Sequence, residues 1–147
     1  MSIQLREITM DNFHDCIRLN VREDQKYFVA PNVYSLAEAK ADGISNPLAI
    51  YNGDTMVGFI MYCFDPDEEM GYIDRLMVDQ RYQGQGYGRA AMVEVIQRLK
   101  SLPACKRIRT SFAHTNEAAD ALYASLGFCR TGEVTEDGKE TVVVLEW

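Results

Sequence analysis

The sequence predicts an α+β fold in which a mixed, mostly antiparallel sheet is flanked by helices. Apolar residues alternate over some segments and recur at helical spacing over others, in the order β-α-α-β-β-β-α-β-α-β-β. The chain has 147 residues, of which 47% are apolar and 25% charged, as in one ordinary globular domain. It contains no linker and no internal repeat, so residues 1–147 are expected to form a single domain.

The first third of the chain predicts one strand and two helices. A short alternating strand covers about 3–8, and Thr9 can cap a helix over about 10–21. The run Ser-Leu-Ala-Glu that begins at Ser35 is a capping-box pattern, which predicts the start of a second helix. Gly43 is expected to end that helix.

The middle of the chain predicts a hairpin, a third strand and a helix. Strands over 48–51 and 55–64 flank Asn-Gly-Asp at 52–54, which is a strong hairpin signal. A third apolar strand over 72–78 leads into a glycine-rich segment. The helix that follows has a broad apolar face and reaches Lys100.

The last third predicts a strand, a helix and a final pair of strands. The strand covers 107–112, and the helix is capped by Asn116 and closed by Gly127. The final strands are expected over about 128–134 and 141–146.

Three glycines at alternate positions, Gly84, Gly86 and Gly88, separate the central strand from the central helix. Glycine permits positive φ and lets a ligand approach the bare backbone. The start of the helix adds unpaired N–H groups and the positive end of a dipole. The segment therefore predicts an anion site.

The residues around this loop narrow the choice of anion. A Walker loop needs Lys and then Ser or Thr after its last glycine, and a dinucleotide fold needs GxGxxG early in a repeated unit; the sequence has neither. What it has is Arg81-x-x-Gly84-x-Gly86 directly after an apolar strand. This pattern resembles the loop with which the GNAT superfamily of N-acetyltransferases cradles the pyrophosphate of coenzyme A. A glycine-rich connection without a ligand is the alternative.

A second motif resembles the same family. Asn116, Ala119 and Tyr123, followed by Leu126-Gly127-Phe128, match the pattern N-x-x-A-x-x-x-Y-x-x-x-G-F. The predicted order of elements also coincides with the GNAT order along the whole chain. Taken alone, Asn116 could be only a helix cap and Tyr123 only a core residue.

The resemblance implies acetyl-CoA as the cofactor, held without a metal. It implies that the end of the central strand pairs with the pantetheine arm and that the glycine loop and helix start hold the pyrophosphate. It further implies that Asn116 binds the pantetheine or carbonyl side and that Tyr123 protonates the leaving thiolate. The implied cofactor-binding residues are Leu76, Met77, Val78, Arg81, Gln83, Gly84, Gln85, Gly86, Tyr87, Gly88, Arg89 and Asn116.

Acetyl transfer to an amine also needs a base, because a primary aliphatic amine with a pKa of about 10 arrives charged. Asp74, four residues before Val78 on the central strand, is the candidate base and a candidate substrate ligand. If the strand is regular, Ile73 and Arg75 point to the opposite face. The alternative is a solvated or salt-bridged strand acid without a catalytic role.

Acidic residues favour a small polycation as the acceptor. The formal net charge is −7, and Glu23, Asp24, Tyr27 and an acidic turn at 65–69 are candidate substrate contacts. The run YIDRLMVDQRYQGQGYGRAAM resembles the bacterial diamine and polyamine acetyltransferase branch of the family, so spermidine or spermine is the expected acceptor. The alternatives are another amine (a protein N-terminus, an aminoglycoside or an amino-acid derivative) and a non-catalytic sensor of acetyl-CoA.

Composition also limits partners and location. The four cysteines form no CxxC pair and the two histidines lack metal-ligand spacing, which favours a cytoplasmic protein with reduced thiols and no metal. The negative charge disfavours nucleic acid, and the apolar runs are too short to span a membrane. The first ten residues lack signal-peptide character. We also expect that the protein can form a homodimer.

Overall fold

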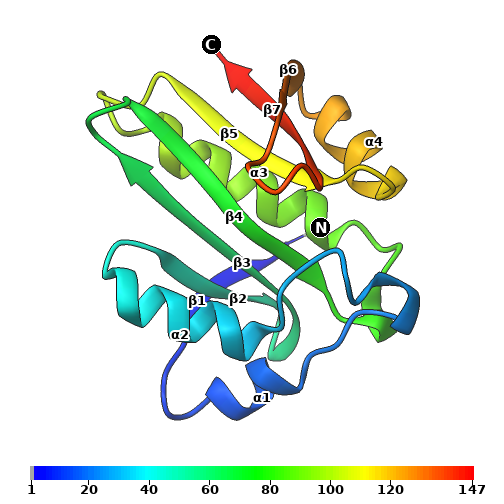
Figure 1. Cartoon of the computed structure of the whole chain (residues 1–147). Helices are drawn as coiled ribbons and strands as arrows, with labels where there is room; N and C mark the ends of the chain where they lie inside the picture. Colours follow the sequence, from blue (N-terminus) through cyan, green and yellow to red (C-terminus); the bar gives the residue numbers. More distant parts are fainter. Residues whose placement is uncertain (1) are drawn as a thin grey trace.

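Within residues 2–147, the part of the chain that the computed structural model describes, the protein forms a seven-stranded sheet with helices on both faces (Figure 1). Met1, the first residue of the predicted domain, lies outside the described residues. The spatial order of the strands is β1-β2-β3-β4-β5-β7-β6, and among these described strands only β4 and β5 pair in parallel. The predicted α+β class with a mixed, mostly antiparallel sheet is confirmed. The strands are β1 Gln4–Glu7, β2 Asn46–Asn52, β3 Thr55–Asp65, β4 Met70–Val78, β5 Arg107–Ala113, β6 Cys129–Val134 and β7 Glu140–Glu146.

The helices divide between the two faces of the sheet. α1 and α2 pack on one face and α3 and α4 on the other, each pair over its own apolar cluster (Figure 1). Their bounds are α1 Phe13–Arg18, α2 Asn32–Asp42, α3 Tyr87–Lys100 and α4 Glu117–Ser125, with two 3-10 turns, η1 Glu23–Gln25 and η2 Gln80–Tyr82.

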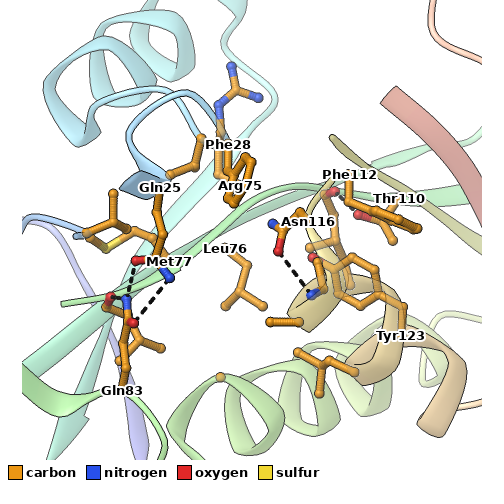
Figure 2. A pocket seen from close by; sticks show the side chains of 18 of the residues that line it. Gln25, Phe28, Arg75, Leu76, Met77, Gln83, Thr110, Phe112, Asn116 and Tyr123 are labelled. Carbon is orange, nitrogen blue, oxygen red and sulfur yellow. Dashed lines mark hydrogen bonds between the residues drawn. The ribbon is translucent and has the colours of Figure 1, made fainter. Parts of the chain in front are cut away.

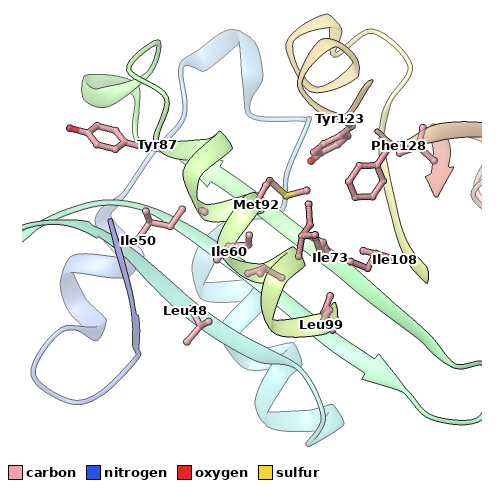
Figure 3. Packing of buried hydrophobic residues seen from close by; sticks show 14 of the residues in the cluster. Leu48, Ile50, Ile60, Ile73, Tyr87, Met92, Leu99, Ile108, Tyr123 and Phe128 are labelled. Atoms are coloured by element: carbon pink, nitrogen blue, oxygen red, sulfur yellow. The ribbon is translucent and has the colours of Figure 1, made fainter. Parts of the chain in front are cut away.

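α3 lies close against the strands of the larger cluster (Figure 3). Its side chains Met92, Val95 and Leu99 are fully buried. A Cβ atom at Gly71 on β4 would lie 2.8 Å from Cδ1 of Leu99, so a larger residue there would force the Leu99 side chain to move. Because these side chains are buried against the sheet, the start of α3 is held beside the end of β4 at Val78.

β4 and β5 are paired over a short distance only. Their parallel register covers Met70 to Tyr72 opposite Arg107 to Arg109, after which Thr110 Oγ1 donates a hydrogen bond of 2.9 Å to the Ile73 carbonyl. Beyond this point the two strands diverge, as Figure 1 shows. Since β4 runs on to Val78, the far half of its edge has no strand partner on the β5 side within residues 2–147.

A β-bulge interrupts β4 at the predicted base. Met61 of β3 pairs with Arg75 and Tyr62 pairs with Ile73, which leaves Asp74 without a partner. The Asp74 carboxylate lies 3.6 Å from the Cys63 Sγ, and Arg75 Nη2 reaches Glu38 of α2 at 3.2 Å. The expectation that Ile73 and Arg75 share the face opposite Asp74 is therefore wrong for Arg75, because the extra residue shifts the alternation.

α1 is much shorter than the expected helix over about 10–21. Residues 10–12 form a turn on the carbonyl of Thr9, and the helix ends at Arg18. The chain then leaves the helix because Asn20 is held at the end of β4: its N–H donates to Asp79 Oδ2 at 2.9 Å, and its carbonyl accepts from Gln80 N–H at 2.8 Å.

The prediction that a capping box at Ser35 starts α2 is also wrong. The helix begins three residues earlier, after Pro31, where the Asn32 side chain donates to the Cys16 carbonyl at 2.9 Å. Ser35 is instead fully buried inside the helix. The predicted end is confirmed, because Gly43 takes the left-handed conformation with φ of 70°.

Candidate active site

A cleft of about 940 Å³ opens where β4 and β5 diverge. One wall is β4 from Tyr72 to Val78, and the other is formed by β5, the first residue of β7 and α4. The chain from Val21 to Pro31 covers one side, and the glycine loop with the start of α3 closes the end. Figure 2 shows these walls, with Leu76 of β4 facing α3 and Tyr123 of α4 on the opposite side. The volume is that of a site for a medium-sized organic ligand.

The glycine loop presents a free helix start to this cleft. Gly84 and Gly86 have φ of 77° and 89°, and Gly86 is the N-cap of α3 without a side-chain cap. A Cβ atom at Gly88 would make an ordinary contact with Val78 Cγ2 at 3.6 Å, so the glycine leaves this part of the space between α3 and β4 unfilled. The first N–H groups of a 14-residue helix are therefore available to an anion in the cleft.

Tyr123 is buried beside the cleft and remains protonated. Its ring lies 5.8 Å from those of Phe112 and Phe128, and 6% of the residue is exposed. Burial raises the pKa of its hydroxyl to about 12; the Thr110 hydroxyl opposes this rise and the Glu140 carboxylate adds to it. The residue can donate a hydrogen bond into the cleft at any physiological pH.

Asn116 caps α4 and also lines the cleft. Its Oδ1 accepts from the Ala119 N–H at 3.2 Å and caps α4, as Figure 2 shows. The residue also lines the cleft, where its side-chain NH2 group can donate to a ligand.

Residues 4–128 match the family model of the acetyltransferase (GNAT) family. The chain belongs to the GNAT acetyltransferase family. The resemblance predicted from the two motifs is confirmed, as is the prediction of an acetyltransferase.

The GNAT assignment is supported by relatives along the whole chain. A spermine/spermidine N(1)-acetyltransferase of Bacillus subtilis (strain 168) is 34% identical over 149 residues, which cover 97% of this chain and 98% of that protein. An acetyltransferase from Thermus thermophilus has a similar fold, with a TM-score of 0.78 and 18% identity over 100% of this chain and 98% of that one. A spermidine N-acetyltransferase from Vibrio cholerae, solved with CoA and spermine, has a TM-score of 0.79 and 14% identity over 98% and 95%.

Two residues of the expected GNAT cofactor loop lie outside the cleft lining. Arg81 belongs to η2 and is turned to the other side, where its Nε pairs with buried Asp79 at 2.8 Å. The Asp79 carboxylate raises the pKa of Arg81. The Arg81 side chain therefore binds Asp79 and does not face the cleft. Gln85 is exposed and also absent from the lining. Tyr87 faces inward, with its hydroxyl accepting from Asn52 at 2.8 Å, so it offers the cleft its backbone.

Gln83 forms a polar clasp between the cofactor loop and the α1–α2 segment (Figure 2). Its Nε2 donates to Gln25 Oε1 at 2.9 Å and to the Val78 carbonyl at 3.0 Å, and its Oε1 accepts from Arg22 Nη1 at 2.8 Å. The clasp joins the two sides of the cleft at the open end of β4. Arg22 and Gln25 were not predicted as site residues, because only the tertiary fold brings them to the loop.

Asp74 lines the cleft from the β4 wall. Although much of its surface is exposed, burial of the carboxylate raises its pKa; the Cys63 thiol and Arg75 oppose that rise, and Glu38 and Asp42 add to it. Asp74 thus faces the cleft from the α2 side of the sheet, with the carboxylates of Glu38 and Asp42 nearby.

The other expected substrate contacts lie outside the cleft or at its rim. Glu23 and Asp24 lie on η1 outside the lining, where Glu23 pairs with Lys26 and Asp24 pairs with Arg22 at 3.2 Å. Tyr27 lies at the rim of the cleft, where 88% of the residue is exposed. The acidic turn at 65–69 lies at the closed end of the two strands, outside the lining. We therefore leave the two η1 acids and the turn out of the acceptor site.

Several lining residues were not among the predicted site residues. Phe28, Thr110, Ser111 and Glu140 all contribute to the walls. Alternation along β5 could have indicated that Ser111 faces away from the core, but nothing local places β7 beside the cleft. Among residues 2–147, no three His, Cys, Asp or Glu side chains are grouped to hold a metal ion, and no helix is long and apolar enough to cross a membrane.

Proposed function

We propose that the protein transfers the acetyl group of acetyl-CoA to a primary amine of a polyamine such as spermidine or spermine. The observation that carries the proposal is the cleft itself. It has a free helix start at one end, a bare strand edge along one wall and a protonated tyrosine on the other. The 34% identity to a spermine/spermidine acetyltransferase over nearly the whole chain supports the polyamine.

The groups of the cleft fit acetyl-CoA. The unpaired edge of β4 from Leu76 to Val78 can hydrogen-bond the amide-rich pantetheine arm as an added strand would. The N–H groups at the start of α3 and the glycines at 84 and 86 suit the pyrophosphate. When bound, acetyl-CoA supplies an activated thioester.

The protein side chains then have separate tasks. Tyr123 donates a hydrogen bond where negative charge develops on sulfur, and Asn116 donates to the pantetheine or carbonyl side. Asp74 offers a carboxylate to the ammonium groups of the acceptor. Backbone N–H groups on the β4 edge polarise the carbonyl that is attacked.

Two other functions make different predictions. Another acceptor amine, such as a protein N-terminus, lacks several ammonium groups and would show little dependence on salt. A sensor would bind acetyl-CoA without releasing thiol.

The test is a thiol-release assay with acetyl-CoA and four acceptors: spermine, spermidine, a monoamine of similar length and a short peptide. We expect both polyamines to give the highest kcat/KM, and we expect added salt to lower it. A preference for the monoamine or the peptide would remove the polyamine but keep the acetyltransferase. Binding of acetyl-CoA without thiol release for any amine would favour the sensor.

We also propose that the enzyme acts in the cytoplasm and forms a homodimer. Light scattering of the purified protein tests the dimer, and a mass equal to one chain would exclude it. Cell fractionation tests the location.

A further inference from the structure

Glu140, the first residue of β7, faces the cleft from the wall opposite Asp74. It pairs with Ala113 in the β5–β7 register, and Ser111 lies two residues before Ala113 on the same face. Ser111 Oγ donates a hydrogen bond of 2.6 Å to Glu140 Oε1. The residue is half-buried, and this hydrogen bond restrains its side chain at the edge of the cleft.

Glu140 and Asp74 are the two carboxylates among the residues that line the cleft. The neighbouring acid Glu133, in contrast, is paired with Arg109 at 3.9 Å. Within the described residues 2–147, the partner of the Glu140 carboxylate is a neutral hydroxyl, and no basic side chain forms an ion pair with it. Its second oxygen is thus available to a cation that enters the cleft.

The charged and titratable groups around Glu140 come from every neighbouring element. Tyr123 of α4 is close enough that the Glu140 carboxylate helps to raise its pKa. Arg109 of β5 lies on the same wall but is directed to Glu133 of β6. The remaining groups are Asp74 and Tyr72 of β4 across the cleft, Lys139 next to it in sequence, and His114, which is bonded to Thr141 and Gly138.

We propose that Glu140, positioned by Ser111, is the base that deprotonates the acceptor amine. This inference rests on the proposed function. Asp74, on the opposite wall, then binds a second ammonium group of the same polyamine. Glu140 is better placed for the base because Ser111 holds its carboxylate at the edge of the cleft, whereas the Asp74 carboxylate accepts a contact from Cys63 Sγ at 3.6 Å.

The proton balance is complete without any further reactant. The Glu140 carboxylate takes one proton from R–NH3⁺, and the freed lone pair forms the N–C bond to the acetyl carbon. The C–S bond breaks, and its electron pair stays on sulfur. The amine loses its second proton, sulfur gains one, and Glu140 later releases its proton to solvent. The products are the acetylated amine, a thiol and one proton in solution.

The test is the pH dependence of kcat/KM for spermidine between about pH 7 and pH 9. For wild type we expect a nearly flat profile, because the enzyme accepts the ammonium form. In Glu140→Gln only the neutral amine can react, so kcat/KM should rise about tenfold per pH unit. With an amine pKa of about 10.4, the loss near pH 7.5 is about 10³-fold. Calorimetry should show an unchanged Kd for acetyl-CoA.

The matched control is Glu146→Gln, on the same face of the same strand but outside the cleft. It should keep the wild-type profile. Glu140 is not the base if Glu140→Gln keeps a flat profile, if wild type already rises tenfold per unit, or if the rise appears in Asp74→Asn instead.

Ser111→Ala tests the same proposal without changing a charge. The loss of a charge-assisted hydrogen bond should lower kcat by about tenfold or more. The pH profile of kcat/KM should stay flat, and Ser111→Thr should restore kcat because it keeps the hydroxyl. An unchanged kcat would refute the positioning role. All variants are assayed with whichever primary amine wild type acetylates, so a wild type that rejects polyamines overturns only the proposed substrate.

Discussion

Replacing Tyr123 by Phe removes one hydroxyl and keeps the ring contacts with Phe112 and Phe128 at 5.8 Å. The size of the effect follows from the pKa of about 12 that burial gives this hydroxyl. A thiol has a pKa of about 8.5, so complete proton transfer from Tyr123 to a thiolate is uphill by about 5 kcal/mol. We therefore expect Tyr123 to stabilise the leaving sulfur mainly by donating a hydrogen bond.

A hydrogen bond to a charged group contributes about 1.5–3 kcal/mol, which corresponds to a fall in the chemical rate of about 10- to 150-fold. The assay is single-turnover acetyl transfer with saturating acetyl-CoA and amine, together with calorimetric binding of CoA, which should be unchanged. Tyr51→Phe is the matched control, since Tyr51 is a buried tyrosine outside the cleft.

Two results would refute this reasoning. A fall greater than about 10³-fold would mean that Tyr123 transfers its proton fully, as a general acid does. A rate equal to that of wild type would mean that the hydroxyl has no part in the chemistry and that the residue only packs.

Three other predictions test the loop, the clasp and the buried thiol. Gly86→Val, at φ of 89°, should weaken CoA binding at least about tenfold, whereas Gly138→Val, at φ of 73° outside the cleft, should keep the affinity; equal affinity in both would exclude the loop as the phosphate site. Gln83→Ala should speed amide hydrogen exchange in η1 by breaking the clasp, and unchanged exchange would show that the clasp does not hold this segment. Burial raises the pKa of Cys16 from 9.0 to about 11, so the unfolded state loses this proton first and stability falls as pH rises through that window. Under reducing conditions the free energy of unfolding of wild type, relative to Cys16→Ala, should drop by about 2 kcal/mol from about pH 8 to pH 10.5, and a constant difference would contradict the pKa shift.

The sequence determined the features that depend on neighbours along the chain. The Asn-Gly-Asp hairpin, the glycine loop before α3, the Asn116 cap and the glycine that ends α2 all follow from local backbone and hydrogen-bond preferences. The element order and the family follow from these same local signals, because each segment carries its own periodicity.

Tertiary structure decided the features that depend on contacts between distant segments. α1 ends early because Asp79 holds Asn20, and α2 starts early because Asn32 is anchored on Cys16. The bulge at Asp74 arises from the β3–β4 register, and no residue pattern within β4 reveals it. Glu140 reaches the cleft only because β7 pairs with β5 on the side where β4 has moved away. Such a position depends on how the sheet is assembled, and local propensities carry no information about that.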